Sequence, residues 1–360
     1  MTDRQAALGF SLISGIGPVT LLRLKKYFSS FSDAYNAPES QLRDAGLLEK
    51  YIQLLKEYRS KIFIDEYEEL LSRKKVWYLS QSEPEYPDGF FALTDPPICI
   101  FGKGDKNILS KIPKVGIVGT RKMSTYGRIV TEKFAMNLGM SGCCIISGLA
   151  IGVDVTAHEA SLATSGRTVA VLGNGVDICF PRMNEKIYQS ILEHEGAIIS
   201  EYPLGTVPSK GSFPARNRLI AALSDCLLVT EGQKKSGSLI TAEKALSLHK
   251  KVFAVPGQVT SSLSEGPFFL LTQGAILALS PDDILKNLGK LPVDQEQKIV
   301  SADEKEVITL LSQEAFSTDE LIHRLKKSYS DISILLSEME MKGLIVKNPH
   351  GKFTIKIRDY

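Results

Sequence analysis

The sequence predicts an α/β protein whose core is a mostly parallel β-sheet. Short, nearly unbroken apolar segments occur between residues 76 and 255, and stretches of helical length separate them. Such segments are typical of parallel strands that helices cover on both faces. Apolar residues at helical spacing precede this region, and a helix followed by two short strands ends the chain. We therefore expect three domains in the 360 residues.

Composition and charge restrict the class of protein. The chain is 43% hydrophobic with a net charge of +2, so only local clusters of charge can argue for a nucleic-acid partner. Its five cysteines form no C-x-x-C pair, which favours reduced thiols over a zinc site or a disulfide framework. No apolar run reaches the roughly 18–20 residues of a membrane span. We expect a cytoplasmic protein without membrane contact.

Residues 1–75 are expected to form a small helical domain. The segments "VTLLRLKKYF" and "YIQLLKEY" have apolar positions at helical spacing. The stretch "LISGIGPVTLLRLKKYF" resembles a helix–hairpin–helix, whose glycines let backbone N–H groups approach a DNA phosphate. A plain structural turn between two helices explains the same pattern equally well.

Residues 76–290 are expected to form the sheet domain. Eight segments read as its strands: "VWYL", "PICIF", "VGIV", "CIIS", "TVAVL", "AIIS", "CLLV" and "VFAV". Parallel strands end at one edge of a sheet, and ligands of open α/β sheets bind at that carboxyl edge. The turns that follow the strands are therefore the places to look for a site.

The first such turn is "GIVGTRKMSTYG", from Gly116 to Gly127. A glycine turn between a strand and a helix is a common phosphate site, and this one also carries Arg121 and Lys122. Its spacing is not G-x-G-x-x-G, and the next strand ends at Ser147-Gly148 with no acid to hold a ribose. No Walker A pattern occurs either. These absences disfavour dinucleotide and ATP sites, and we expect no cofactor.

Two later turns suggest an extended anion. The segment "KGSFPARNRLIAAL" places two arginines in the first turns of a helix, where the helix dipole prefers negative charge. An external phosphate would supply it, and Phe213 would offer a face for base stacking. The alternatives are a solvated helix face and a core aromatic. With "SGSLITAEKAL", the candidate DNA-binding residues are Gly119, Thr120, Arg121, Lys122, Ser147, Gly148, Lys210, Phe213, Arg216, Asn217, Arg218, Ser236, Gly237, Ser238 and Thr241.

Asp154 and His158 form the one pair that resembles catalytic machinery. They stand four residues apart in "GVDVTAHEASL", as a base and its orienting carboxylate would on one helical face. No nucleophile motif and no second histidine at metal-ligand spacing accompany them. A buried, hydrogen-bonded structural histidine is therefore favoured. We expect no catalytic residue, no metal and no enzymatic activity.

The chain is expected to end in a winged helix over residues 301–360, after a linker over residues 291–300. This last segment has a net charge of −1, and its would-be recognition helix carries Asp331, Glu338 and Glu340. Acidic side chains would face DNA phosphates unfavourably. A role in packing or protein contact is favoured over DNA reading.

The motifs "VGTRKMSTYG", "IISGLAIGVDVTAHEASL", "TVAVLGNGVD", "SEYP", "FPARNRLIAALSD", "SGSLITAEKAL" and "VFAVPGQ" occur in the order found in the DprA/Smf family of DNA-processing proteins. The resemblance spans residues 84–288. It implies an extended Rossmann-like core that dimerises, with a helical, SAM-like domain before it and a winged helix after it. It also implies a protein that binds and protects single-stranded DNA and loads the RecA recombinase during natural transformation and homologous recombination.

The same resemblance implies roles for individual residues. Arg121 would contact a DNA phosphate, Lys210 the backbone, and Phe213 a base. The chain departs from the family after "PGQVTSSLSEG", where Pro267-Phe268-Phe269-Leu270 replaces an asparagine near a Leu-Ile pair. Two adjacent phenylalanines suggest packing or a subunit contact there.

Two other classes of function remain open from the sequence. One is a nucleotide-hydrolysing enzyme that resembles the lysine-decarboxylase-like phosphoribohydrolases, which carry a P-G-G-x-G-T-x-x-E turn. This chain has only Glu243 at the comparable place and lacks the glycine pair. The other class is a recruitment scaffold that acts through its winged helix without binding DNA.

Overall fold

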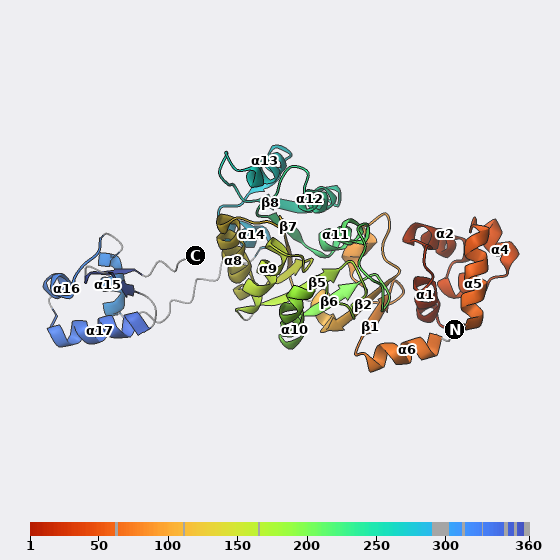
Figure 1. Cartoon of the computed structure of the whole chain (residues 1–360), viewed down its shortest axis with the longest axis horizontal. Coiled ribbons are helices and arrows are strands. Elements are labelled where there is room, and N and C mark those ends of the chain that lie inside the picture. Colours follow the sequence, from red (N-terminus) through yellow and green to blue (C-terminus); the bar gives the residue numbers. More distant parts are fainter. Residues whose placement is uncertain are drawn as a thin grey trace. The chain divides into compact units, whose positions relative to one another are not determined.

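The computed structural model describes residues 1–61, 64–110, 112–164, 166–289, 302–311, 314–325, 327–341, 345–348 and 351–355. The chain divides into two compact units, Met1–Pro292 and Val293–Tyr360. Figure 1 colours the first from red to teal and the second blue. The expected linker over residues 291–300 lies outside the described residues.

Six helices form the first part of unit 1: α1 (Asp3–Ser11), α2 (Pro18–Phe28), α3 (Phe31–Asn36), α4 (Glu39–Asp44), α5 (Glu49–Lys61) and α6 (Ile64–Arg73). Helix α1 begins with a capping box, in which the side chains of Thr2 and Gln5 each accept a hydrogen bond from the other's backbone N–H. The turn before α2 passes through Gly15 at φ +92°, a conformation that glycine adopts without strain. Local sequence thus sets the α1–α2 turn.

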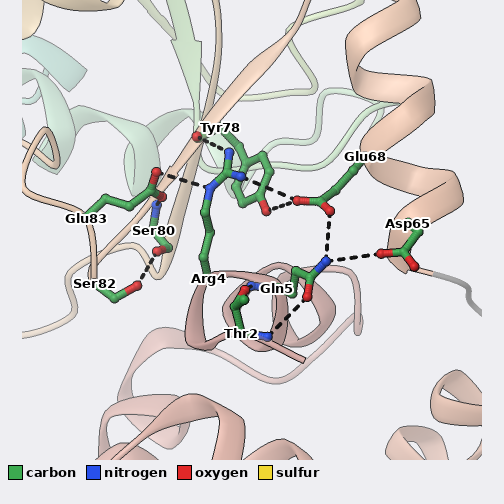
Figure 2. Close-up of polar contacts among 9 residues, drawn as sticks. All are labelled: Thr2, Arg4, Gln5, Asp65, Glu68, Tyr78, Ser80, Ser82 and Glu83. Atoms are coloured by element: carbon green, nitrogen blue, oxygen red, sulfur yellow. Dashed lines mark hydrogen bonds and ion pairs between the residues drawn. The ribbon is translucent and has the colours of Figure 1, made fainter.

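A polar network fixes these helices to the first strand of the sheet, β1 (Trp77–Ser80) (Figure 2). The guanidinium of Arg4 on α1 lies 3.8 Å from the centroid of the Tyr78 ring. The same group contacts Glu83 at 3.1 Å and Glu68 of α6 at 3.5 Å. The Tyr78 hydroxyl donates to Glu68 at 2.5 Å. One arginine therefore joins two helices to the sheet.

A nine-stranded sheet follows, in the order β1-β2-β6-β5-β4-β3-β7-β8-β9. The pairs β1–β2 and β2–β6 are antiparallel, and the pairs from β6 to β9 are parallel. The mostly parallel sheet is thereby confirmed. The strands are β2 (Cys99–Gly104), β3 (Lys114–Val118), β4 (Cys144–Ser147), β5 (Arg167–Leu172), β6 (Ala197–Ser200), β7 (Cys226–Val229), β8 (Lys251–Ala254) and β9 (Ile276–Leu277).

Helices cover both faces of this sheet (Figure 1). Residues of α7, α11, α12 and α13 share a buried apolar cluster with one face, and residues of α8, α9 and α14 share another with the opposite face. Helix α13 packs through Leu270, which is buried, and Phe269, which is partly buried. The helices are α7 (Asp88–Phe91), α8 (Thr125–Met140), α9 (Val153–Leu162), α10 (Glu185–Glu193), α11 (Ser212–Leu223), α12 (Gly237–Ser247), α13 (Glu265–Thr272) and α14 (Pro281–Asn287), with single 3₁₀ turns at Lys106–Leu109, Arg182–Asn184 and Ser262–Ser264.

Unit 2 has the helices and the hairpin of a winged helix: α15 (Ala302–Leu311), α16 (Thr318–Leu325), α17 (Tyr329–Met341), β10 (Ile345–Lys347) and β11 (Phe353–Ile355). The two strands pair antiparallel over a small apolar core. The acidic side chains of α17, Asp331, Glu338 and Glu340, are all exposed. The surface of this helix is therefore acidic, as the sequence predicts.

Two features of other protein classes are absent from the described residues. None of the helices there combines the length and the apolar character that crossing a membrane requires. No group of three or more histidine, cysteine or acidic side chains is arranged there to hold a metal ion.

The sequence analysis missed one strand. β9 has two residues, and both are exposed, so it lacks the apolar run that identified the other eight strands. It is held in the sheet by parallel pairing with β8, which local pattern does not reveal.

Candidate nucleic-acid interface

The predicted polar turns meet at the point where the strand order reverses. β3 lies between β4 and β7, so the chain runs outward from β3 in one direction and later returns to its other side. Crevices at such switch points are where open α/β sheets bind ligands. A cavity of about 460 Å³ lies there. It is lined by Val118, Gly119, Thr120, Arg121, Ala150, Asp154, Lys210, Phe213, Pro214, Arg216, Asn217, Ile220, Ser236, Gly237, Ser238 and Thr241.

Three glycines at the strand ends let other elements approach the cavity. A Cβ at Gly119, after β3, would lie 2.5 Å from a methyl group of Val153 on α9. A Cβ at Gly148, after β4, would lie 2.6 Å from the guanidinium of Arg216 on α11. A Cβ at Gly173, after β5, would lie within 3.2 Å of α11. Glycine is therefore required at these strand ends for close packing.

Helices α11 and α12 both begin at the cavity, and neither has an acidic residue in its first turn. The N-cap residue of α11 is Gly211, and the Ser209 hydroxyl accepts from the Ser212 N–H at 3.2 Å; the N-cap side chain of α12, Ser236, makes no capping hydrogen bond. At the start of α12, the Ser236 and Ser238 hydroxyls bond each other at 2.7 Å. Two helix N-termini without an acidic first turn converge on one cavity, which favours an external anion.

Helix α8, which follows the first glycine turn, is different. Its N-cap residue Ser124 donates from its N–H and its hydroxyl to the carboxylate of Glu231, at 2.9 and 2.5 Å. A Cβ at Gly127 would lie 2.1 Å from that carboxylate. The buried Glu231 thus takes the position of an anion at this helix start. The expectation of a phosphate at the α8 terminus is corrected, and Arg121 is what the turn contributes to the cavity.

Arg121, Lys210 and Phe213 are brought together as the sequence predicts. Arg121 and Lys210 are exposed, and Phe213 is half-buried. The Arg121 guanidinium lies 5.6 Å from the centroid of the Phe213 ring. Phe213 belongs to none of the hydrophobic clusters of unit 1. It is therefore a rim residue of the cavity and not a core aromatic.

Arg216 lines the cavity, but its side chain is buried and hydrogen-bonded to the backbone. Its side chain is only 4% exposed, and its Nη1 donates to the carbonyls of Gly148, at 2.7 Å, and Val171. Burial lowers the pKa of Arg216 to about 10, which leaves the guanidinium charged at neutral pH. Burial also raises the pKa of Asp154, whose carboxylate accepts from the Gly148 N–H at 3.1 Å. Arg216 thus fixes the ends of two strands, and direct phosphate contact by its side chain is corrected.

Arg218 does not reach this cavity. Its side chain is 12% exposed and forms ion pairs with Asp95 at 2.8 Å and Glu201 at 2.6 Å. It lines a larger cavity of about 1060 Å³ between the N-terminal helices and the sheet. The prediction that Arg218 positions a phosphate is corrected, because two carboxylates already neutralise it.

Ser147 and Gly148 are also displaced from the predicted site. Both are buried, and the Ser147 hydroxyl donates to the Ile117 carbonyl at 2.6 Å. They support the cavity floor and offer no surface to a ligand. Asn217 keeps a place in the cavity wall, where its amide nitrogen donates to the Gly237 carbonyl at 3.3 Å. Lys122 is exposed beside Arg121 but lies outside the lining.

His158 is a buried structural histidine, as favoured above. It is fully buried, and its Nδ1 lies 2.6 Å from the Thr168 hydroxyl. That hydroxyl donates to the Ile145 carbonyl, so Nδ1 carries the proton of this bond. Burial and the nearby charge of Arg216 lower the pKa of His158 to about 3. The imidazole therefore stays neutral and is not available as a base at the surface.

The sequence analysis missed two residues of this region. Glu231 lies two residues after the end of β7, and its role as an internal anion has no sequence signal beyond that position. Phe180 is 43% exposed, and its ring stacks on Phe213 with centroids 5.6 Å apart and planes inclined by 29°. An aromatic residue next to proline in a loop after a strand was the available signal.

The family described as DNA recombination-mediator protein A matches residues 77–289, and the DprA winged helix domain matches residues 291–351. A Synechocystis protein named Smf is 32% identical over 96% of this chain and 97% of its own length. The DNA processing protein DprA of Bacillus subtilis is 41% identical over 58% of this chain and 69% of its own.

Two solved structures are similar as well. The DNA processing protein A of Streptococcus pneumoniae matches with a TM-score of 0.69 and 32% identity, over 79% of this chain and 98% of that one. The Helicobacter pylori protein, whose structure is titled for its single-stranded DNA binding mode, matches with a TM-score of 0.54 and 34% identity, over 59% and 95%. The family match covers more than half of the chain, including the whole sheet and its basic cavity. The chain belongs to the DNA recombination-mediator protein A family, the DprA/Smf proteins.

Proposed function

We propose that this protein binds single-stranded DNA at the cavity on the carboxyl edge of its sheet. The observation that carries the proposal is the meeting of Arg121, Lys210 and Phe213 beside two helix N-termini that lack an acidic residue. Two exposed cations and the helix starts would hold phosphates, and the half-buried ring would stack on a base. Asp154 is the one carboxylate among the described residues that line the cavity, and Arg216 lies beside it.

The shape of the site favours single strands over duplex. A base can stack on Phe213 only when its face is free, and in a duplex every face is already stacked. The Helicobacter pylori relative, whose structure describes a single-stranded DNA binding mode, is similar over 59% of this chain.

Titration of labelled oligonucleotides tests this proposal. The full chain should bind a single-stranded oligothymidine more tightly than a duplex of equal length. Its affinity should fall as salt rises, because bound cations release counterions from the DNA. Equal affinity for both forms, or an affinity that does not change with salt, would contradict the proposal.

We propose that the protein acts by binding and not by catalysis. The rival function, hydrolysis of nucleotides, would need an acid at the cavity. Glu243 is exposed on α12 and does not line the cavity, and burial in the cavity wall ties Asp154 to structural hydrogen bonds. Incubating the protein with nucleoside monophosphates should release no free base. Sustained turnover would establish the rival function.

We further propose that the bound strand is passed to the RecA recombinase in the cytoplasm, during natural transformation and homologous recombination. Membership of a family described as recombination mediators supports this proposal. The protein should accelerate RecA assembly on strands coated by single-strand-binding protein. Unchanged assembly would restrict its role to binding and protecting DNA.

The core is proposed to form a homodimer. Strand β9 lies at the edge of the sheet, and its Ile276 and Leu277 are exposed, as is Leu279 after it. An uncovered apolar edge strand favours pairing with a second chain. Light scattering should show a dimer for the wild-type chain and a shift toward monomer for Leu277→Lys. An unchanged mass in Leu277→Lys would place the contact elsewhere.

A further inference from the structure

We infer that Phe180 is a second base-stacking residue, so that each protomer holds two bases beside the cavity; the inference rests on the proposed binding of single-stranded DNA. Phe180 lies in the loop after β5 and Phe213 in the first turn of α11. Their rings are stacked at 5.6 Å between centroids. The two side chains thus form one aromatic column at the rim of the cavity.

Exposure distinguishes Phe180 from an ordinary packing residue. Its ring is 43% exposed even though it contacts Phe213. Phe180 does not line the cavity, whereas Phe213 does. A base on Phe213 would therefore lie inside the cavity, and another base of the same DNA strand, on Phe180, would lie just outside. Aromatic side chains in single-strand sites commonly stack successive bases in this way.

The surroundings of Phe180 would suit a single DNA strand that runs out of the cavity. Three other large apolar side chains are exposed in the loops after β4, β5 and β6, which end at the same edge of the sheet: Ile151, Met183 and Val207. Arg182, two residues along the chain from Phe180, is exposed and can approach a backbone phosphate. Apolar surface with an adjacent cation suits bases joined by a charged backbone.

Affinity measurements test the role of the ring. Phe180→Leu keeps an apolar side chain against Phe213 but removes the aromatic face. Its affinity for a short oligothymidine should fall about 5- to 100-fold, the equivalent of one base–aromatic stack, with an unchanged salt dependence. Phe180→Tyr should bind like the wild type. Met140→Ala, at an exposed position at the end of α8 and away from the cavity lining, should also bind like the wild type.

Fluorescence gives a direct readout that folding defects cannot imitate. The chain has a single tryptophan, Trp77, so the wild type supplies the background for a Phe180→Trp variant. Saturating oligothymidine should quench the added indole by stacking. The matched Met140→Trp variant should show little quenching.

The outcomes separate the inference from the function on which it rests. If the wild type binds with the expected salt dependence while Phe180→Leu is unaffected and Phe180→Trp is not quenched, only the inference fails. The exposed apolar edge would then belong to a protein contact. If the wild type does not bind single strands at all, the proposed function fails and the inference falls with it.

Discussion

Two cavities of unit 1 differ in the sign of the charge that lines them as well as in size. The larger, about 1060 Å³, lies between the N-terminal helices and the sheet and is lined by Glu66, Asp95 and Glu201 against Arg73 and Arg218. The smaller, about 460 Å³, is lined by Arg121, Lys210 and Arg216 against Asp154. The larger space is acidic on balance and the smaller one basic. For a polyanion, the sign of the lining charge outweighs the volume.

The arginines of the "ARNR" segment show how the difference arises. Arg216 and Arg218 stand two residues apart on α11, so they leave the helix on different sides and reach different cavities. In the larger cavity, two carboxylates neutralise Arg218. In the smaller cavity, Arg216 donates to backbone carbonyls and keeps its charge.

The acidic lining of the larger cavity also bears on the turn that resembles a helix–hairpin–helix. The turn before α2, including Gly15 and Gly17, lines the larger cavity. Its backbone would meet a phosphate only in the company of Glu66, Asp95 and Glu201. The structural-turn interpretation of that motif is therefore favoured over DNA contact.

The largest expected effect is a loss of folding stability around the larger cavity, with DNA binding unchanged. Arg218→Met removes two ion pairs and leaves Glu201, whose side chain is 11% exposed, buried beside Asp95. Removing one partner of a buried pair destabilises a protein by about 3–5 kcal/mol. Chemical denaturation should show this loss, while the salt dependence of DNA binding stays at its wild-type value.

A surface pair provides the control for this variant. Arg128→Met removes an exposed pair with Glu132 and should change the free energy of unfolding by less than about 1 kcal/mol. A reduced salt dependence of DNA binding in Arg218→Met would show that DNA does reach the larger cavity. DNA binding would then not be confined to the smaller, basic cavity.

The second effect is on the dependence of folding stability on pH, through the buried His158. Burial lowers the pKa of His158 from its usual 6.5 to about 3. Between these values the unfolded chain binds the proton and the folded chain does not. The contribution of His158 to the free energy of unfolding is therefore fully present at neutral pH. It is lost as the pH falls below about 6.5, by up to about 1.4 kcal/mol per pH unit.

Denaturation at several pH values measures this loss. His158→Gln should flatten the dependence of stability on pH, whatever its effect at neutral pH. His194→Gln, at an exposed position after α10, should leave the dependence as it is. An equally steep dependence in His158→Gln would mean that another group is responsible.

The fold was predictable to a large extent because its signals are local. Eight of the nine strands of the large sheet are apolar runs bounded by turns. β9 was not predictable, because only its pairing with β8 defines it as a strand.

The site was predictable in part. Arg121, Lys210 and Phe213 were found from residue type and from the rule that parallel strands end at one edge. Arg218 and Ser147 were assigned wrongly, because their partners, Glu201 and the Ile117 carbonyl, come from distant segments of the chain. Sequence shows which residues can bind an anion, but it does not show which are already bound.

A third, smaller effect tests the rim of the basic cavity. Phe213→Ala should weaken binding of single-stranded DNA by about 1–3 kcal/mol at every salt concentration, the worth of one stacked base. It removes no charge, so the salt dependence should not change. A core aromatic would instead cost about 3–5 kcal/mol of folding stability on truncation. Thermal melts run beside the titrations decide between the two, and a strongly lowered melting temperature would contradict the rim assignment.

The smallest effect measures the charge of the two cavities directly. Lys210→Gln should lower the slope of log affinity against log salt by about 0.7, the contribution of one phosphate contact on a single strand. Combining it with Arg121→Gln should lower the slope by about 1.4, because the two cations act on separate phosphates. Arg73→Gln removes a cation from the larger cavity and should leave the slope unchanged. If Arg73→Gln lowers the slope as much as Lys210→Gln does, the strand runs over both cavities, and the acidic lining of the larger one does not exclude it.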